Sequence, residues 1–279
     1  MATELKNGEA KEYYENGKLK FVGNYLNGKR HGKGKEYYEN GDRYSDDKLK
    51  YDGEYLNGER NGKGKEYYEN GELEFDGEYS NGKRNGKGKE YYKTGDRYSD
   101  VKLKLKFDGE YLNGKRHGKG REYYEKRDRY FGYFDDKLKV KFDGEYLNGE
   151  RNGEGKEYDS DGKLKYYGEY LNGERHGKGK EYYENGKIKF EGKYINGKIN
   201  GKWREYYDNG KIKLEGEYSN GEGKVLEYDS DGKLKFDGEY LNGKRNGKGK
   251  EYYDYGELIF EGEYFNGKRF GKGKEYENG

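Results

Sequence analysis

One short pattern recurs along the chain and limits what the chain can fold into. It is clearest between Phe236 and Tyr253, where the sequence reads FDGEYLNGKRNGKGKEYY. Its anchor is a glycine two residues before a tyrosine, and the anchor recurs at intervals of 22 to 35 residues, most often 24. The anchors are Gly23, Gly53, Gly77, Gly109, Gly144, Gly168, Gly192, Gly216, Gly238 and Gly262. A period of this size indicates a repeat architecture, in which each unit packs mainly on its neighbours.

The first half of each repeat predicts a β-strand. In the first full repeat, Leu19, Phe21, Gly23 and Tyr25 alternate with more polar residues and share one face. A period of two is typical of a half-buried strand. No segment shows helical periodicity, so we predict an all-β fold.

The second half of each repeat predicts a turn and a second strand. Asn27-Gly28 tolerates the positive φ angles of a tight turn, a short strand follows over 33–38, and Asn40-Gly41 closes the unit. Each repeat is then one β-hairpin, and chain neighbours become sheet neighbours. We predict a twisted antiparallel β-meander of about ten hairpins, as a single array over 1–279 with a half repeat at 1–17 and ten repeats over 18–279.

Glycines inside strands usually weaken a sheet. Here they recur opposite aromatic residues, so we predict that a ring lies across each bare glycine backbone. The predicted positions are Gly34, Gly64, Gly88, Gly120, Gly179, Gly249 and Gly273. The alternative, a phosphate-binding loop, is disfavoured because GKGK lacks the hydroxyl residue and the helix of the Walker pattern.

Composition favours a core made of rings. Hydrophobic residues make up only 28% of the chain and charged residues 42%, but there are 37 tyrosines and 11 phenylalanines. Rings supply large buried area per residue. Cysteine and proline are absent, so disulfides and thiolate chemistry are excluded and a reducing compartment is allowed. With neither an apolar signal segment nor a membrane span in the sequence, we expect a soluble, cytoplasmic protein.

The run GEYLNGKRHGKG at 109–120, repeated at a period near 24, resembles the MORN (membrane occupation and recognition nexus) repeat. The resemblance covers nearly the whole chain. It departs from the family in a tyrosine-rich second strand, three insertions that contain Asp-Arg-Tyr, and altered repeats around Trp203 and Gly221. It implies an elongated antiparallel ribbon that acts as a scaffold or dimerisation module, in cytoskeletal assemblies or at membranes. Some bacterial members are antitoxin-like, and catalysis in the family lies in separate domains.

The turns after Asn-Gly are basic, although the net charge of the whole chain is only +2. Such charges commonly keep a sheet edge soluble. The functional alternative is that they meet anionic lipid, an acidic partner or the acidic edge of another copy. The candidate residues for that contact are Lys29, Arg30, Lys83, Arg84, Lys115, Arg116, Lys244 and Arg245. Nucleic acid is disfavoured as a partner, because carboxylates are almost as numerous as basic groups.

The longest insertion, KRDRYFGYFDDK at 126–137, carries Tyr130, Phe131, Tyr133 and Phe134. These rings either pack on neighbouring hairpins or form a partner-binding hot spot. The three insertions are equally open to two interpretations, a binding side of the array and drift in repeat length.

The sequence contains no group of residues typical of a catalytic or metal-binding site. His31, His117 and His176 occupy a turn position that is Asn in other repeats, and no metal-ligand set accompanies them. The DSDG runs at 159–162 and 229–232 lack the remaining calcium ligands. We therefore predict a non-enzymatic scaffold with no cofactor, no metal and no small-molecule substrate, which binds a protein partner or itself. The alternatives are peripheral binding to anionic lipid and antitoxin-like inhibition of a partner.

Overall fold

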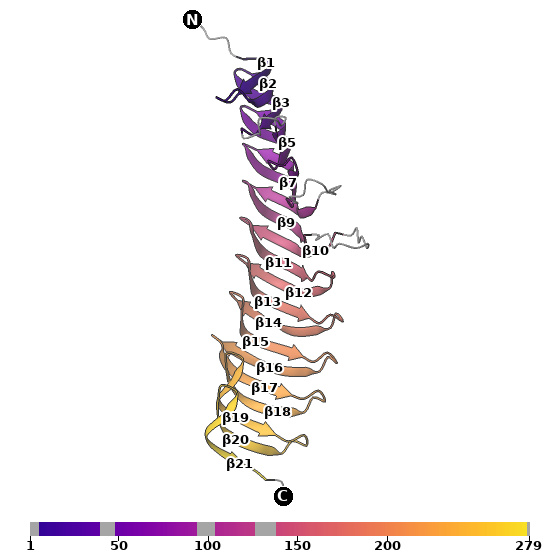
Figure 1. Ribbon diagram of the computed structural model, residues 1–279. Helices are drawn as coiled ribbons and strands as arrows, with labels where there is room; N and C mark the ends of the chain where they lie inside the picture. The colour runs from indigo at the N-terminus through magenta and orange to yellow at the C-terminus, as the bar shows by residue number, and fades with distance from the viewer. Residues whose placement is uncertain (1–5, 40–47, 94–103, 126–137, 278–279) are drawn as a thin grey trace. The chain divides into compact units, whose positions relative to one another are not determined.

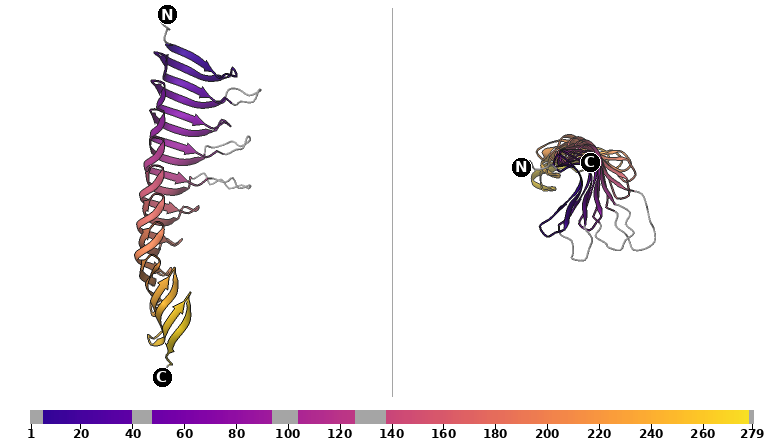
Figure 2. Two further views of the ribbon diagram at one scale, coloured as in Figure 1. Left: turned by 90° about the vertical axis from the view of Figure 1, so that its left-hand side faces the viewer. Right: turned by 90° about the horizontal axis from the view of Figure 1, so that it is seen from above.

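The computed structural model describes residues 6–39, 48–93, 104–125 and 138–277, and all of its regular elements in that part of the chain are β-strands. The chain forms two compact units, 1–150 and 151–279, which we describe separately. Figures 1 and 2 show the strands of each unit lying side by side in chain order. The predicted fold class, a twisted antiparallel meander of hairpins, is confirmed; a single array over 1–279 stays a prediction.

The first unit contains ten strands. They are β1 (Gly8–Tyr13), β2 (Leu19–Leu26), β3 (Lys29–Tyr37), β4 (Leu49–Leu56), β5 (Glu59–Tyr67), β6 (Leu73–Ser80), β7 (Lys83–Tyr91), β8 (Leu105–Leu112), β9 (Lys115–Tyr123) and β10 (Val140–Leu147). Each strand pairs antiparallel with the next along the chain.

The second unit repeats this arrangement. Its strands are β11 (Glu150–Tyr158), β12 (Leu164–Leu171), β13 (Glu174–Tyr182), β14 (Ile188–Ile195), β15 (Lys198–Tyr206), β16 (Ile212–Ser219), β17 (Glu222–Tyr228), β18 (Leu234–Leu241), β19 (Lys244–Tyr252), β20 (Leu258–Phe265) and β21 (Lys268–Glu275). Pairing is again antiparallel between consecutive strands.

Two backbone devices shape the hairpins, and the second of them is missing only from β16–β17 among the described strands. The turn residues Asn27 and Gly28 both have positive φ, 51° and 77°, as a two-residue turn that follows strand twist requires. The second strand then carries a bulge at Gly32, where φ is 71° and the register shifts between Gly23 and Tyr25. The bulge brings Arg30, Gly34 and Glu36 onto the same face as the rings.

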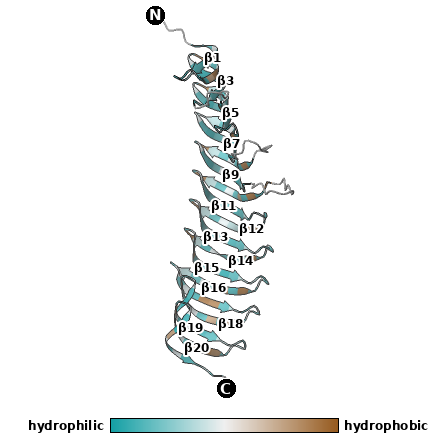
Figure 3. Ribbon diagram, in the orientation of Figure 1, coloured by the Kyte–Doolittle hydropathy of each residue, from teal (hydrophilic) through white to brown (hydrophobic). Residues whose placement is uncertain are grey.

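The core of each sheet is a row of rings on one face, which we call the ring face. Phe21 is fully buried, and its ring meets Tyr25 and Tyr55 edge to face at centroid distances of 5.7 and 5.2 Å. Tyr51 continues the row through Tyr55 in the same geometry. Figure 3 is mostly teal along the strands because charged residues, which make up 42% of the chain, rank as strongly hydrophilic on that scale.

The rings lie directly on glycine backbone, as the sequence predicts. A Cβ added to Gly88 would lie 2.6 Å from Cε2 of Phe75 and 3.2 Å from Cε2 of Tyr111. The same conflict with a ring exists at each predicted glycine, namely Gly34, Gly64, Gly120, Gly179, Gly249 and Gly273. Glycine is therefore required at these positions by close packing, and its φ there is ordinary.

A layer of ion pairs covers the rings, and we call it the arginine–glutamate ladder. The guanidinium of Arg60 lies 4.1 Å above the centroid of Tyr51, within cation–π range. It bridges Glu36 at 2.8 Å and Glu66 at 2.6 Å. Arg30 also reaches Glu36, so each glutamate joins two repeats. Burial alone would raise the pKa of Glu36, but the hydrogen bonds and charges of Arg60, Tyr55 and Arg30 together outweigh it and hold that pKa below its usual value.

The doubled tyrosine at the end of the second strand links successive repeats. The hydroxyl of Tyr38 donates to the carbonyl oxygen of Tyr67 at 2.6 Å, and Tyr68 donates to Tyr91 at 3.0 Å. In the second unit, Tyr183 donates to Tyr206 at 2.6 Å. This link explains the tyrosine-rich second strand.

Two repeats of the second unit depart from glycine at the packing position, and the ring beside it changes as well. Val225 takes the glycine position, and Leu214 takes the position of the ring. Trp203 takes the same position one repeat earlier and stacks on Phe190 at 6.0 Å, with 16° between the ring planes. The larger Val225 is thus matched by a smaller Leu214, whereas Trp203 keeps the phenylalanine across from it and stacks on its ring.

This matching predicts a non-additive pair of substitutions. Gly88→Val should destabilise by about 1–3 kcal/mol or more through overpacking against Phe75. Phe75→Leu alone should cost about 1–2 kcal/mol through lost packing. The double variant reproduces the natural Leu214–Val225 pair, so it should be more stable than the sum of the two losses by about 0.5–3 kcal/mol. Urea unfolding of the four proteins measures the coupling, and strict additivity would contradict the ring–glycine account.

Buried tyrosines predict loss of stability in alkali. Burial raises the pKa of Tyr25 and of Tyr166 to about 12 from an ordinary value of 10.0. A raised pKa contributes stability that is complete below the unfolded value and is lost as the pH rises towards the folded value. The urea midpoint should therefore hold steady up to pH 10 and fall between pH 10 and about 12.

Tyr166→Phe is the matched control for this prediction. Its buried hydroxyl finds no hydrogen-bond partner among the described residues, and phenylalanine occupies the same position in Phe21 and Phe75. The variant should match the wild type at neutral pH and lose less stability in alkali. An unchanged alkaline profile would show that Tyr166 does not contribute to the loss.

Candidate functional site

The face opposite the rings, which we call the outer face, carries charged side chains in a regular pattern. In one row, each second strand presents a basic residue to a carboxylate on the next strand. Examples are Lys35 with Asp52 at 3.6 Å and Lys65 with Asp76 at 3.6 Å. Both members of each pair are about half exposed, so such pairs contribute little to stability.

A second row alternates lysine and glutamate across the strands. Glu54 lies opposite Lys33 on one side and faces the bulge that contains Lys63 on the other. The glutamates of this row also support the bulges, since Glu239 accepts a hydrogen bond from the backbone N–H of Lys248 at 2.9 Å. Positive and negative charges thus balance locally along most of the row.

In the second unit, the outer face departs from this pattern at three neighbouring places. Tyr167 stands where most other repeats have a carboxylate, and Leu226 stands where they have a basic residue. Lys193 stands where the neighbouring repeats have Glu169 and Glu217. The register places Lys193 directly opposite Lys178.

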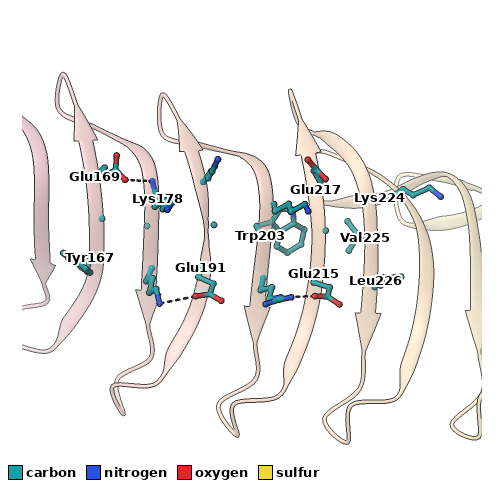
Figure 4. A pocket seen from close by; sticks show the side chains of 18 of the residues that line it. Tyr167, Glu169, Lys178, Glu191, Trp203, Glu215, Glu217, Lys224, Val225 and Leu226 are labelled. Carbon is teal, nitrogen blue, oxygen red and sulfur yellow. Dashed lines mark hydrogen bonds and ion pairs between the residues drawn. The ribbon is translucent and has the colours of Figure 1, made fainter.

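These departures border a groove of about 1040 Å³ on the outer face. The backbones of Gly168, Gly179, Gly192 and Gly216 contribute to its lining. Figure 4 shows one wall with Glu169, Lys178, Glu217 and Lys224 and the other with Tyr167, Glu191, Glu215 and Leu226, while Trp203 and Val225 lie between them. All lining residues belong to the second unit.

Behind the middle of the groove, at β14–β16, the ring face lacks the arginine of the ladder, although Arg175 on β13 keeps its pairs with Glu157 and Glu181. Ile199 stands in the arginine position, and Glu205 pairs instead with Lys213 at 2.8 Å. Trp203 is 6% exposed and also contacts the ring of Tyr218 at a centroid distance of 5.1 Å. Ring contacts of Trp203 therefore take the place of the arginine–ring contact behind this part of the outer face.

The structure separates the predicted basic residues into two sets. Lys29, Lys83, Lys115 and Lys244 are exposed beside the Asn-Gly turns. Their neighbours Arg30, Arg84, Arg116 and Arg245 are half-buried on the ring face and engaged by glutamates in the ladder. Binding of lipid or an acidic partner by these eight residues stays a prediction, which the lysines are better placed to fulfil.

The edge with the Asn-Gly turns also exposes apolar side chains, and we call it the turn edge. Leu26 pairs across the turn with Lys29, and Leu112 pairs with Lys115. Leu26 is 48% exposed and Leu112 is 44% exposed. Apolar and basic groups therefore alternate along this edge in several repeats.

Other predicted features fall outside the groove. Tyr130, Phe131, Tyr133 and Phe134 lie outside the described residues. The first DSDG run is a hairpin turn, because the carboxylate of Asp159 accepts backbone hydrogen bonds from Asp161 and Lys163, both at 2.9 Å.

Sequence reasoning did not identify Tyr167, Lys193 or Leu226. An alignment of the repeats would reveal them, because each differs from the residue usual at its position. At 192–194, for example, GKY stands in place of GEY. The sequence alone does not show that the glutamate of GEY belongs to a row on the outer face, because that row follows only from the strand register.

Within the described residues, no three or more His, Cys, Asp or Glu side chains gather in a way that would hold a metal ion. The same part of the chain contains no helix with the length and apolar character needed to cross a bilayer.

Comparison with protein families identifies the repeats independently. A family model described as the MORN repeat matches residues 21–43, 51–72, 75–97, 107–129, 142–163, 236–256 and 260–279. A model described as a MORN repeat variant matches residues 6–27, 175–196, 199–220 and 221–242. The variant matches in the second unit coincide with the repeats that carry Lys193, Trp203 and Leu226. No curated protein shows a significant match to the chain.

Proposed function

Because the chain belongs to the MORN repeat family, we propose that it is a non-enzymatic scaffold that binds a protein partner across the outer face of its β-hairpins. The observation that carries this proposal is the groove at β12–β17. There Tyr167, Lys193 and Leu226 break an otherwise regular pattern of paired charges on the outer face. Aromatic and aliphatic anchors surrounded by charged side chains are typical of protein-binding sites.

The charges in the groove support binding and not catalysis. Lys180 pairs with Glu191 at 3.3 Å, and Arg204 pairs with Glu215 at 3.0 Å. The hydrogen bond from the Tyr206 hydroxyl, at 2.6 Å, is the main reason why the pKa of Glu191 lies below its usual value. A general acid or base works best with a pKa near the operating pH. Glu191 is instead held ionised.

The scaffold proposal predicts that restoring the regular pattern abolishes partner binding. The triple variant Tyr167→Asp, Lys193→Glu, Leu226→Lys installs residues that other repeats already carry at these positions. It should fold like the wild type and should fail to retain proteins that the immobilised wild type captures from an extract of its source cells. Quantitative mass spectrometry of the two captures measures the difference.

The control exchanges a regular pair in the first unit. Lys65→Asp with Asp76→Lys preserves the net charge and the ion pair, which spans 3.6 Å in the wild type. This variant should capture the same proteins as the wild type. Equal capture by the wild type and the triple variant would contradict a binding role for the groove.

The turn edge supports a second candidate, peripheral binding to anionic lipid. Exposed leucines beside exposed lysines match what a bilayer interface accepts, and each basic residue near an anionic surface contributes about 1 kcal/mol. Leu112 and Leu147 are both 44% exposed.

For this candidate we expect flotation with vesicles that rises with their phosphatidylserine content and falls with salt. The variant Leu112→Ser, Leu147→Ser should float less. It should keep its stability, because Ser80 and Ser219 occupy the same position in other repeats. If the protein floats with none of the vesicles, whatever their lipid composition, the lipid candidate is ruled out and the scaffold proposal is unaffected.

A further inference from the structure

Three lysines on consecutive strands stand together on one wall of the groove. Lys178 on β13 pairs in register with Lys193 on β14. Lys193 also faces the bulge of β15, where a Cβ built on Gly201 would lie 3.6 Å from its Cδ, and Lys202 follows that glycine. All three are exposed. Lys202 lies opposite Glu217 in register, but within the described part of the chain no ion pair engages any of the three lysines.

We propose that Lys178, Lys193 and Lys202 anchor an acidic polypeptide segment that lies in the groove across β12–β17. This inference rests on the proposed function, since it names the chemistry of the protein partner that the outer face would bind. It follows from the charges of one row of the groove, where Lys178, Lys193, Lys202 and Lys224 outnumber Glu169 and Glu217.

Like charges directly opposite each other on neighbouring strands destabilise the pairing. Elsewhere a glutamate separates the lysines of this row, as Glu239 does: it lies opposite Lys224 and accepts a hydrogen bond from the backbone N–H of Lys248. Lys193 removes that glutamate from the centre of the groove. The result is a compact positive centre, and carboxylates of a bound segment would relieve its repulsion.

Two apolar side chains near the ends of the groove indicate the length of the bound segment and the positions of its apolar residues. Tyr167 on β12 is 36% exposed, and Leu226 lies on β17. Five strand spacings of about 4.8 Å separate these strands, or about 24 Å, which is the length of about seven extended residues. The expected segment carries carboxylates at its centre and an apolar side chain towards each end.

The surrounding carboxylates favour a short acidic segment over a continuous polyanion. Glu169 and Glu217 border the lysines in the same row, and Glu191 and Glu215 line the facing wall. A nucleic acid or a flat anionic bilayer would bring negative charge against these groups as well. A peptide with a local cluster of acids avoids them.

Direct binding tests the proposal. The probe is a fluorescent synthetic peptide with glutamates at alternate positions and a leucine at each end, compared with its glutamine analogue by fluorescence anisotropy. The glutamate peptide should bind at least about tenfold more tightly at low salt, a difference of about 1.4 kcal/mol, and the advantage should shrink as salt is raised. Equal binding of the two peptides would overturn the proposal.

The decisive variant is Lys193→Glu, which restores the residue found in Glu169 and Glu217 and should therefore fold normally. It should lose the preference for the glutamate peptide. Lys87→Glu in the first unit makes the same change in net charge and should leave peptide binding unchanged. Its fold has a natural precedent, because Glu154 occupies the corresponding position. Undiminished binding by Lys193→Glu would overturn the proposal.

Two further outcomes separate this inference from the scaffold proposal. Loss of partner capture by the groove triple variant, with no binding of the glutamate peptide, would overturn the acidic-segment inference alone. Binding of short-chain polyphosphate or phosphatidylserine vesicles that depends on Lys193, without peptide binding, would also overturn it and would identify a phosphate group as the ligand.

Discussion

The contact between an aromatic ring and a bare glycine backbone underlies the rest of this structure. A single sheet has no second layer to bury its apolar face, so each ring must be covered within the sheet itself. Glycine lets the ring lie flat against the backbone of the next strand, as Phe75 does on Gly88. Arg60 and its equivalents then cover the rings from above, and the glutamates that hold them join one repeat to the next.

The same contact explains why the second unit can differ without losing its fold. Where valine replaces glycine, leucine replaces the ring, and where tryptophan replaces glycine, Phe190 turns to stack on it. Both exchanges keep the ring face filled. The strands over which the outer-face side chains depart from the regular charges thereby stay paired, although β17 is shorter and pairs with β16 without the bulge.

Period-two alternation and the Asn-Gly turns were sufficient to predict the hairpins, the ring face and the packing glycines, because each depends on residues within one repeat. The destination of the arginines was not predictable in the same way. Simple alternation does not show that Arg30 shares the ring face with Gly34, because the bulge at Gly32 changes the phase between them. The groove was missed for another reason, since its lysines come from three strands and only the register brings them together.

The hydrogen bond that closes each repeat has a consequence for chain length. Tyr14 N–H donates to the carbonyl of Lys18 at 2.9 Å across a short turn. The equivalent bond from Tyr38 to Lys48 is also 2.9 Å, and that from Tyr92 to Lys104 is 2.8 Å, although many more residues separate their ends. The pairing of the strands therefore depends on the positions of the two ends of the connection and not on the number of residues between them. This edge is a natural grafting position, where foreign sequence can enter without altering the spacing of the strands.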